Sequence, residues 1–238
     1  MNESIIKHFK LTFKKFVEIT EFSNEPGIYA LFFCGEQFPI PNYQPKCDEI
    51  IYIGKTESSQ KQRDANTHFA DGKTGSSTLR KTFGSLLYTN LNLIPIPRSQ
   101  SDIDKKRHAH FKFDNKSEKK ITNWMSENLG LAFYPYPKSK TEIDLLETNL
   151  IKELVPICNI DRKNIVNPFY DHIRSLRKGV GQIAFDSVTV IGKVTTIIER
   201  RVPIIPNTNR SSNIDIHSHK YELFWKLQLP FILDSNNK

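Results

Sequence analysis

The chain has 238 residues, of which 38% are hydrophobic and 25% charged, and its formal net charge at pH 7 is +8. This length suits one elaborated domain, or a core domain with a smaller appendage. Sixteen Phe and eight Tyr supply enough apolar area for a sizeable core, which argues against a disordered chain. No apolar run approaches about 20 residues, so we expect no membrane-spanning segment. The positive charge favours polyanionic partners.

The N-terminal segment and the cysteines favour a cytoplasmic protein. Residues 1–22 mix Lys, Glu and apolar side chains, and they lack the uninterrupted apolar core of a signal peptide. The three cysteines (Cys34, Cys47 and Cys158) are odd in number and show no CxxC spacing. This pattern argues against a disulfide framework or a zinc knuckle, so a reducing cytoplasm is the expected location.

The predicted elements begin with a helix over residues 4–19, where apolar side chains recur at helical spacing. Segments rich in aromatic and β-branched residues predict three strands, over 27–33, 49–53 and 131–136. One or two helical turns are expected over 61–69, and further helices over 119–128 and 168–178. Another helix is expected to begin after a cap at Ser76 or Ser77. The helix from Thr141 to about Leu154 is expected to begin with Thr141 and Asp144 as a capping box. A β-hairpin around Gly192 is expected over 183–201.

Positive charge is concentrated in residues 72–120, which contain eleven Lys or Arg and four acids. A solvated basic loop and a phosphate-contacting surface explain this charge equally well. The candidate phosphate contacts are Lys73, Arg80, Lys81, Lys105, Lys106 and Arg107.

The helix predicted from Thr141 carries an acid on its apolar side. At 100° per residue Ile143, Leu146 and Leu150 form a core-facing stripe, and Glu147 lies about 40° from Ile143. An acid on a buried face is unfavourable unless it is paired or binds a metal. The alternative is an acid at the edge of the stripe that pairs with a lysine.

Two tripeptides occupy neighbouring predicted strands, Gly27-Ile28-Tyr29 on the first and Tyr52-Ile53-Gly54 on the second. Arg63, His68, the run Leu146–Lys152 around Glu147, Pro156 and Asn159 follow in that order. Together these blocks resemble the GIY-YIG nuclease superfamily over about residues 25–160. The resemblance implies an α/β (α+β) fold, with a small three-stranded antiparallel sheet flanked by helices. We expect an N-terminal helix in 1–24, this nuclease domain in 25–160 with a basic insertion at about 72–120, and a β-containing extension in 161–238.

The resemblance also implies a chemistry, which is hydrolysis of DNA phosphodiesters with one divalent metal. Glu147 would bind Mg²⁺, for which Mn²⁺ would substitute. Arg63 would hold the phosphate, Tyr29 would orient or deprotonate the attacking water, and Tyr52 would complete the pocket. Asn159 would position the helix of Glu147 or the substrate. For the two tyrosines, ordinary strand packing is the alternative.

Two departures from the family pattern bear on the site. His68 lies five residues after Arg63, where the family commonly has Tyr or His four residues after, and that position holds Thr67. Either this turn is irregular or His68 is not the second acid–base group. The tripeptides are also separated by twenty-two residues, which resembles the longer hairpins of restriction-type relatives. Lys55, directly after the second tripeptide, either contacts phosphate or is a solvated loop residue.

These observations predict a DNA endonuclease, with a restriction or defence role ahead of a structure-specific repair role. An inactive DNA-binding module and a protein-interaction role are the alternatives. The extension over 161–238 is a candidate surface for DNA recognition or dimerisation, which leaves a homodimer open.

Overall fold

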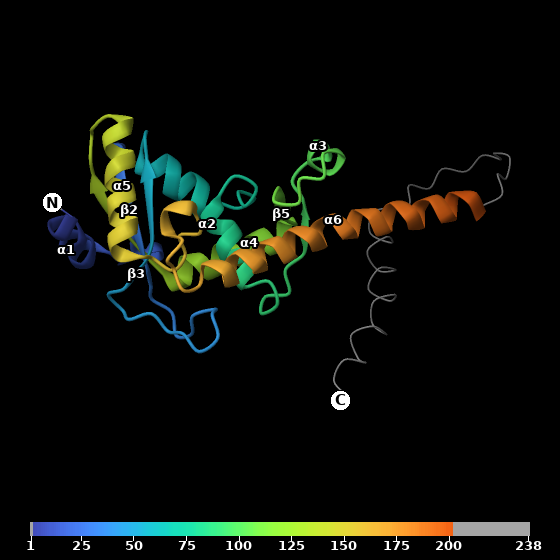
Figure 1. Ribbon diagram of the computed structural model, residues 1–238, viewed down its shortest axis with the longest axis horizontal. Helices are drawn as coiled ribbons and strands as arrows, with labels where there is room; N and C mark the ends of the chain where they lie inside the picture. The colour runs from blue at the N-terminus through green and yellow to red at the C-terminus, as the bar shows by residue number, and fades with distance from the viewer. Residues whose placement is uncertain (1, 202–238) are drawn as a thin grey trace. The chain divides into compact units, whose positions relative to one another are not determined.

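The computed structural model of the chain describes residues 2–201, with side chains as far as residue 188. Up to Thr195 the chain forms one compact unit. Its centre is a four-stranded antiparallel sheet with the order β1-β6-β2-β3 (Figure 1). The strands are β1 (Lys14–Lys15), β2 (Gly27–Phe33), β3 (Ile50–Thr56) and β6 (Leu129–Pro135). The α/β fold and its three expected strands are confirmed, and β1 adds a short fourth strand.

All seven residues of strand β2 are buried. Since alternate side chains point to opposite sides of a strand, both faces of β2 are covered. Ile28, Ala30 and Phe32 pack against α1 (Asn2–Thr12) and α5 (Lys140–Leu154). Tyr29, Leu31 and Phe33 belong to the larger core on the other face. That core also takes apolar side chains from α2 (Thr78–Leu86), α4 (Asn115–Asn128) and α6 (Tyr170–Arg201).

The pairing of β2 with β3 shifts between Leu31 and Phe32. Leu31 lies opposite Tyr52, whereas Phe32 lies opposite Ile50, so Ile51 is an extra residue on β3. A bulge of this kind redirects the side chains around it. Ile51 and Tyr52 both contribute to the core that contains Tyr29, although they are consecutive. The regular register places Tyr52 on the same face as Tyr29, and the bulge adds Ile51 to that face.

The N-terminal helix is shorter than the predicted one. It ends at Thr12, and β1 and the 3₁₀ turn η1 (Phe16–Glu18) follow. Phe13 stacks on Phe32 with ring centroids 4.3 Å apart, whereas Phe16 stacks on Phe69 at 3.6 Å. Phe32 and Phe69 lie on opposite faces of the sheet. The apolar side of one straight helix over residues 4–19 could not contact both faces.

Two of the predicted helices begin at capping residues. Ser77 caps α2, because its Oγ accepts a hydrogen bond from the backbone N–H of Arg80 at 3.1 Å. Helix α5 begins one residue earlier than expected. Its capping box is formed by Ser139 and Glu142 rather than by Thr141 and Asp144.

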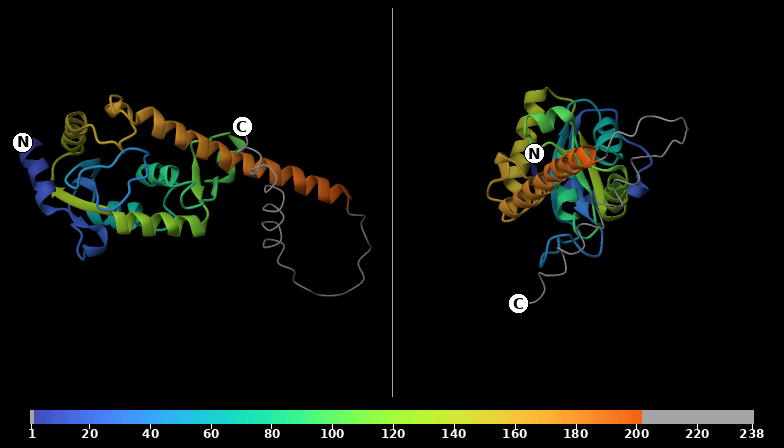
Figure 2. Two further views of the ribbon diagram at one scale, coloured as in Figure 1. Left: turned by 90° about the horizontal axis from the view of Figure 1, so that it is seen from below. Right: turned by 90° about the vertical axis from the view of Figure 1, so that its right-hand side faces the viewer.

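The basic insertion folds into small elements of its own. Strands β4 (Pro95–Pro97) and β5 (Phe111–Phe113) form a two-stranded sheet, and α3 (Gln100–Asp104) lies between them in the sequence. In Figures 1 and 2 these elements lie toward the end of the unit away from α1 and α5. The insertion is therefore ordered structure and not a plain solvated loop.

The β-hairpin expected over 183–201 is wrong, because these residues continue helix α6. Ile173, Val180 and Ala184 are buried along one face of this helix at separations of seven and four residues. The many β-branched residues after residue 187 favour a strand locally, but the backbone there continues a helix whose earlier turns pack on the core. The remainder of the expected β-containing extension, 202–238, lies outside the described residues. No helix within residues 2–201 is long and apolar enough to cross a membrane.

Candidate active site

Tyr29 and Gly54 lie directly opposite each other on β2 and β3. A Cβ atom added to Gly54 would come within 2.2 Å of both Cζ and Oη of Tyr29. The missing side chain of Gly54 is therefore the space through which the phenol of Tyr29 crosses β3. The ring of Tyr52 stacks beside it, with centroids 6.1 Å apart.

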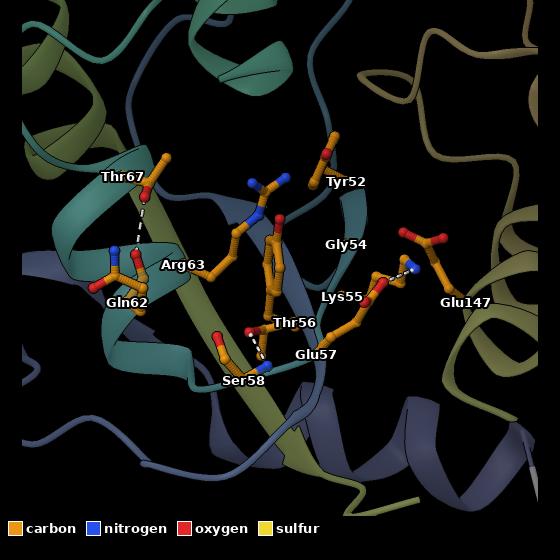
Figure 3. A pocket seen from close by; sticks show the side chains of 11 residues that line it. Tyr52, Gly54, Lys55, Thr56, Glu57, Ser58, Gln62, Arg63, Thr67 and Glu147 are labelled. Carbon is orange, nitrogen blue, oxygen red and sulfur yellow. Dashed lines mark hydrogen bonds and ion pairs between the residues drawn. The ribbon is translucent and has the colours of Figure 1, made fainter. Parts of the chain in front are cut away.

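A cavity of about 410 Å³ opens at this crossing, beside the edge strand β3 (Figure 3). Tyr29, Tyr52, Arg63 and Glu147 line it. Its remaining walls come from the end of β3 and from η2 (Lys61–His68), with the residues Gly54, Lys55, Thr56, Glu57, Ser58, Gln62 and Thr67. The structure thus gathers four of the six expected catalytic residues around one space.

The turn that carries Arg63 and His68 is irregular, which was one of the two alternatives drawn from the spacing of these residues. Segment η2 is a π-helix, in which the backbone N–H of Phe69 donates to the carbonyl of Asp64 five residues earlier. This wider turn takes up the additional residue between Arg63 and His68. Arg63 consequently lines the cavity, while His68 is fully buried behind it.

His68 joins Tyr29 to Ser77 in a buried chain of hydrogen bonds. Nε2 of His68 lies 2.7 Å from Oη of Tyr29, and Nδ1 lies 2.7 Å from Oγ of Ser77. A phenol is a stronger acid than a neutral imidazole N–H, so we assign Tyr29 as the donor to Nε2. Nδ1–H then donates to Ser77, which fixes the tautomer of the ring.

Burial keeps both members of this pair neutral. It lowers the pKa of His68 well below its ordinary value, and the charges of Arg63 and Arg80 lower it further. Burial also raises the pKa of Tyr29 well above 10, with further increases from Tyr52 and Asp64, although the charge of Arg63 opposes them. His68 is therefore a neutral hydrogen-bond acceptor for Tyr29, and both a buried imidazolium and an isolated Tyr29 phenolate are unfavourable.

Arg63 carries a positive charge that its neighbours do not neutralise. Among the described residues, its buried Nε has no hydrogen-bond partner. The adjacent Asp64 is fully buried, and within the same part of the chain both of its carboxylate oxygens lack partners. Burial raises the pKa of Asp64 well above the ordinary value, although the charge of Arg63 opposes this. Because burial favours the neutral form of Asp64, the charge of Arg63 stays available to an anion in the cavity.

Glu147 reaches the cavity from α5, around the edge strand β3 (Figure 3). Its side chain is 13% exposed, and Oε2 accepts a hydrogen bond from Nζ of Lys163 at 2.7 Å. Glu147 therefore lies at the edge of the apolar stripe and pairs with a lysine, which was the alternative to a metal ligand. It also faces the cavity. Lys55 is paired with Glu57 and Asp144 at the cavity wall.

The residues present fit a sparsely coordinated Mg²⁺ ion. The Glu147 carboxylate is a hard oxygen donor on the wall of the cavity, and its salt-bridge partner Lys163 is itself 38% exposed and free to move aside. Among residues 2–188 no three His, Cys, Asp or Glu side chains gather as a metal cage. An ion there would take its other ligands from water and phosphate, which Mg²⁺ readily does.

Asn159 does not face the cavity but fastens β3 from behind. Its side-chain Oδ1 accepts from the backbone N–H of Ile53 at 2.8 Å, and Nδ2 donates to the carbonyl of Ile53 at 2.8 Å. The N–H of Cys158 donates to the carbonyl of Ile51. These bonds cover the open edge of β3 at Ile51 and Ile53. Asn159 thus positions strand β3, whereas we expected it to position the helix of Glu147 or the substrate.

A family profile described as the GIY-YIG catalytic domain matches residues 27–179, more than half of the chain. The chain belongs to the GIY-YIG catalytic domain family. The match supports a nuclease of this superfamily, and GIY-YIG nucleases act on DNA. It extends beyond residue 160, where we expected the domain to end, into α6. No curated protein and no solved structure matches the chain.

The residues expected to contact DNA are spread over this GIY-YIG domain. Arg80 is fully buried in an ion pair with Glu118 at 2.7 Å, so its assignment as a DNA contact is wrong. Lys73, Lys105, Lys106 and Arg107 are exposed and do not line the cavity. Arg107 lies 3.9 Å from Asp102. Lys81 is half-buried, and its Nζ donates to the carbonyl of Ala109 at 3.2 Å.

Sequence reasoning missed three parts of the GIY-YIG site. Ser77 was assigned only as a helix cap, and its contact with His68 depends on a fold that brings residues nine apart together. Lys163 was not considered, although it follows Asn159 by four residues. Asp64 was missed as well, and its adjacency to Arg63 was the one signal available.

Proposed function

We propose that this GIY-YIG domain is a divalent-metal-dependent endonuclease that hydrolyses DNA phosphodiester bonds. The observation that carries the proposal is the convergence of Tyr29, Tyr52, Arg63 and Glu147 on one cavity, with the phenol of Tyr29 2.7 Å from a neutral His68. A nucleophile activator, a phosphate-binding cation and a carboxylate are the groups that such a hydrolysis requires.

The buried chain of hydrogen bonds supports orientation of the attacking water by Tyr29. Because Oη donates its own proton to Nε2 of His68, its lone pairs are left to accept a hydrogen bond from that water. The proton that the water loses passes to a phosphate oxygen of the substrate, so neither the free phenolate nor the imidazolium that burial makes unfavourable has to form. Ser77 holds the ring so that Nε2 is the acceptor throughout.

The cations and the second tyrosine would hold the phosphate. The guanidinium of Arg63 has donors for two phosphate oxygens and stabilises charge that grows on them. Tyr52 stacks beside Tyr29 and limits how the substrate enters. Glu147 would hold the Mg²⁺ ion, for which Mn²⁺ would substitute. When bound, the ion supplies polarisation of the phosphate and stabilisation of the leaving oxygen.

Hydrolysis of this kind leaves 3′-hydroxyl and 5′-phosphate ends. The insertions around a lone catalytic core favour a restriction or defence role, with structure-specific repair as the second candidate. An inactive DNA-binding module is disfavoured, because Tyr29, Tyr52, Arg63, Glu147 and Asn159 are all present. A cytoplasmic location follows from the same role. One active site cuts one strand, so cleavage of both strands would require a homodimer or a second binding event by the same monomer.

Cleavage of supercoiled plasmid and of single-stranded circular DNA in the presence of Mg²⁺ tests the proposal. We expect the wild type to cut at least one of them, and Glu147→Gln to cut neither. Glu153→Gln is the matched control, because Glu153 is an exposed acid on the same helix that contacts Asn2. Equal cutting by wild type and Glu147→Gln would reject the assignment of Glu147, and no cutting by the wild type would reject an active nuclease on these substrates.

A further inference from the structure

A second cavity, of about 350 Å³, lies between α6 and the segment that leads into β5. We call it the α6 pocket and define it by His108, Tyr170, Arg174, Arg177 and Lys178, which line it. Among the side chains that the structure describes, no acidic residue lines this pocket. Three of the five are cations at pH 7, within a space smaller than the active-site cavity.

The cations of the α6 pocket lie on one helical face. Arg174 precedes Arg177 by three residues and Lys178 by four, which are the spacings that make side chains neighbours on a helix. Like charges at these spacings destabilise a helix. No ion pair joins Arg174, Arg177 or Lys178 to an acid among the side chains that the structure describes. The repulsion is therefore left uncompensated within residues 2–188.

Lys81 adds a fourth cation beside the pocket. Its ammonium lies 5.7 Å from the ring centroid of Phe111, which also lines the pocket. Burial, together with the charges of Arg177 and Arg98, lowers the pKa of Lys81 to about 8. An anion bound nearby would relieve this repulsion and raise the pKa of Lys81 again.

The walls of the α6 pocket are fixed to each other and to the active site. Gly181 packs so closely on His108 that an added Cβ would lie 2.3 Å from the carbonyl oxygen of His108. Ile160 lines the pocket, and it directly follows Asn159, which fastens β3. Burial lowers the pKa of Arg177, and Tyr52, which lines the catalytic cavity, lies near enough to oppose this shift. The pocket is therefore a preformed neighbour of the catalytic cavity.

We propose that the α6 pocket binds a backbone phosphate of the DNA that is cut in the active-site cavity. The proposal rests on the proposed nuclease function and names the surface by which the substrate is held. Arg174 and Arg177 supply planar donors that match phosphate oxygens. Tyr170, whose ring centroid lies 6.0 Å from the guanidinium of Arg174, keeps that arginine in place. Contacts of this kind position the strand and carry no sequence readout.

The test is the salt dependence of DNA binding by the full chain, measured by fluorescence anisotropy of a labelled duplex with EDTA present so that nothing is cut. The double variant Arg174→Gln/Arg177→Gln removes the contacts to one phosphate. The slope of log K against log salt should become shallower by about 0.9, the value for one neutralised phosphate. Between about 50 and about 200 mM salt the affinity advantage of the wild type should then shrink about 3.5-fold.

Lys7→Gln/Lys10→Gln is the matched control, because it removes two cations from α1, on the opposite face of the sheet. It should keep the slope of the wild type. The melting temperature of the arginine double variant should stay unchanged or rise, since repulsion is removed and no ion pair is lost, whereas a purely structural role would lower it.

A double variant with the wild-type slope would overturn the α6 pocket as a phosphate site, and the nuclease proposal would stand if the wild type still cuts plasmid in a Glu147-dependent way. Equal loss in the lysine control would also overturn it, because the effect would then follow net charge alone. A wild type that shows no salt-dependent binding to DNA would overturn both proposals.

Discussion

The substitution Gly54→Ala tests the crossing of Tyr29 over β3. The new methyl group would lie 2.2 Å from Cζ and Oη of Tyr29, far inside ordinary contact distance. Tyr29 is fully buried between Tyr52 and His68, so its ring has little room to move away. Overpacking of this kind costs about 1–3 kcal/mol, and loss of the Tyr29–His68 hydrogen bond adds about 1 kcal/mol.

Thermal unfolding followed by circular dichroism should show a Tm lowered by about 4–16 °C, at about 2–4 °C per kcal/mol for a chain of this size. A displacement of the phenol by about 1 Å should also lower plasmid cleavage about 100-fold. Gly179→Ala is the control, because no atom lies within 4 Å of the added carbon and α6 gains helix propensity. Wild-type stability and cleavage in Gly54→Ala would refute the reasoning.

Three further predictions concern the residues behind the cavity. Ser77→Ala should lower the cleavage rate and narrow the pH range over which cleavage is fast, because Nδ1 of His68 loses the acceptor that fixes its tautomer. Ser99→Ala, which removes the cap of α3, should leave the profile unchanged, and identical profiles for the two variants would reject the role of Ser77. Glu118→Ala should lower the free energy of unfolding by about 3–5 kcal/mol in urea denaturation, since it leaves Arg80 charged and unpaired in the core. A loss no larger than that of the exposed Asp48→Ala would contradict this. Stability should fall as pH drops below about 6.5, because unfolded His68 takes up a proton that the buried ring, with its lowered pKa, does not. His68→Gln should make that slope shallower by up to about 1.4 kcal/mol per pH unit, and an unchanged slope would mean that His68 is protonated in the folded chain.

The strands and their active-site residues could be predicted from the sequence because their signals are local. Gly27 to Phe33 alternates between two buried faces, and the two tripeptides mark the neighbouring strands. The helix around Glu147 was located to within one residue by its apolar period and by Pro156. Patterns of this kind depend on residues close together in the chain.

The parts that could not be predicted depend on contacts between distant residues. Helix α6 carries a strand-like composition after residue 187, yet these residues continue a helix whose earlier turns pack on the core through Val180 and Ala184. Arg80 counted as positive charge in a basic segment, yet Glu118, thirty-eight residues later, pairs with it in the core. The π-helical turn of η2 could be inferred only as an alternative, because the spacing of Arg63 and His68 has no meaning until both are placed around Tyr29.

The central claim is that the phenol of Tyr29 takes part in cleavage of a DNA strand. The most direct measurement is the single-turnover rate of Mg²⁺-dependent plasmid cleavage by Tyr29→Phe, with Tyr43→Phe as the matched control. Tyr43 donates its hydroxyl to Glu49 and does not line the cavity. We predict that Tyr29→Phe lowers the rate at least about 100-fold, in the range of general acid–base catalysis, and that Tyr43→Phe keeps the wild-type rate. Equal rates for Tyr29→Phe and the wild type would contradict the account.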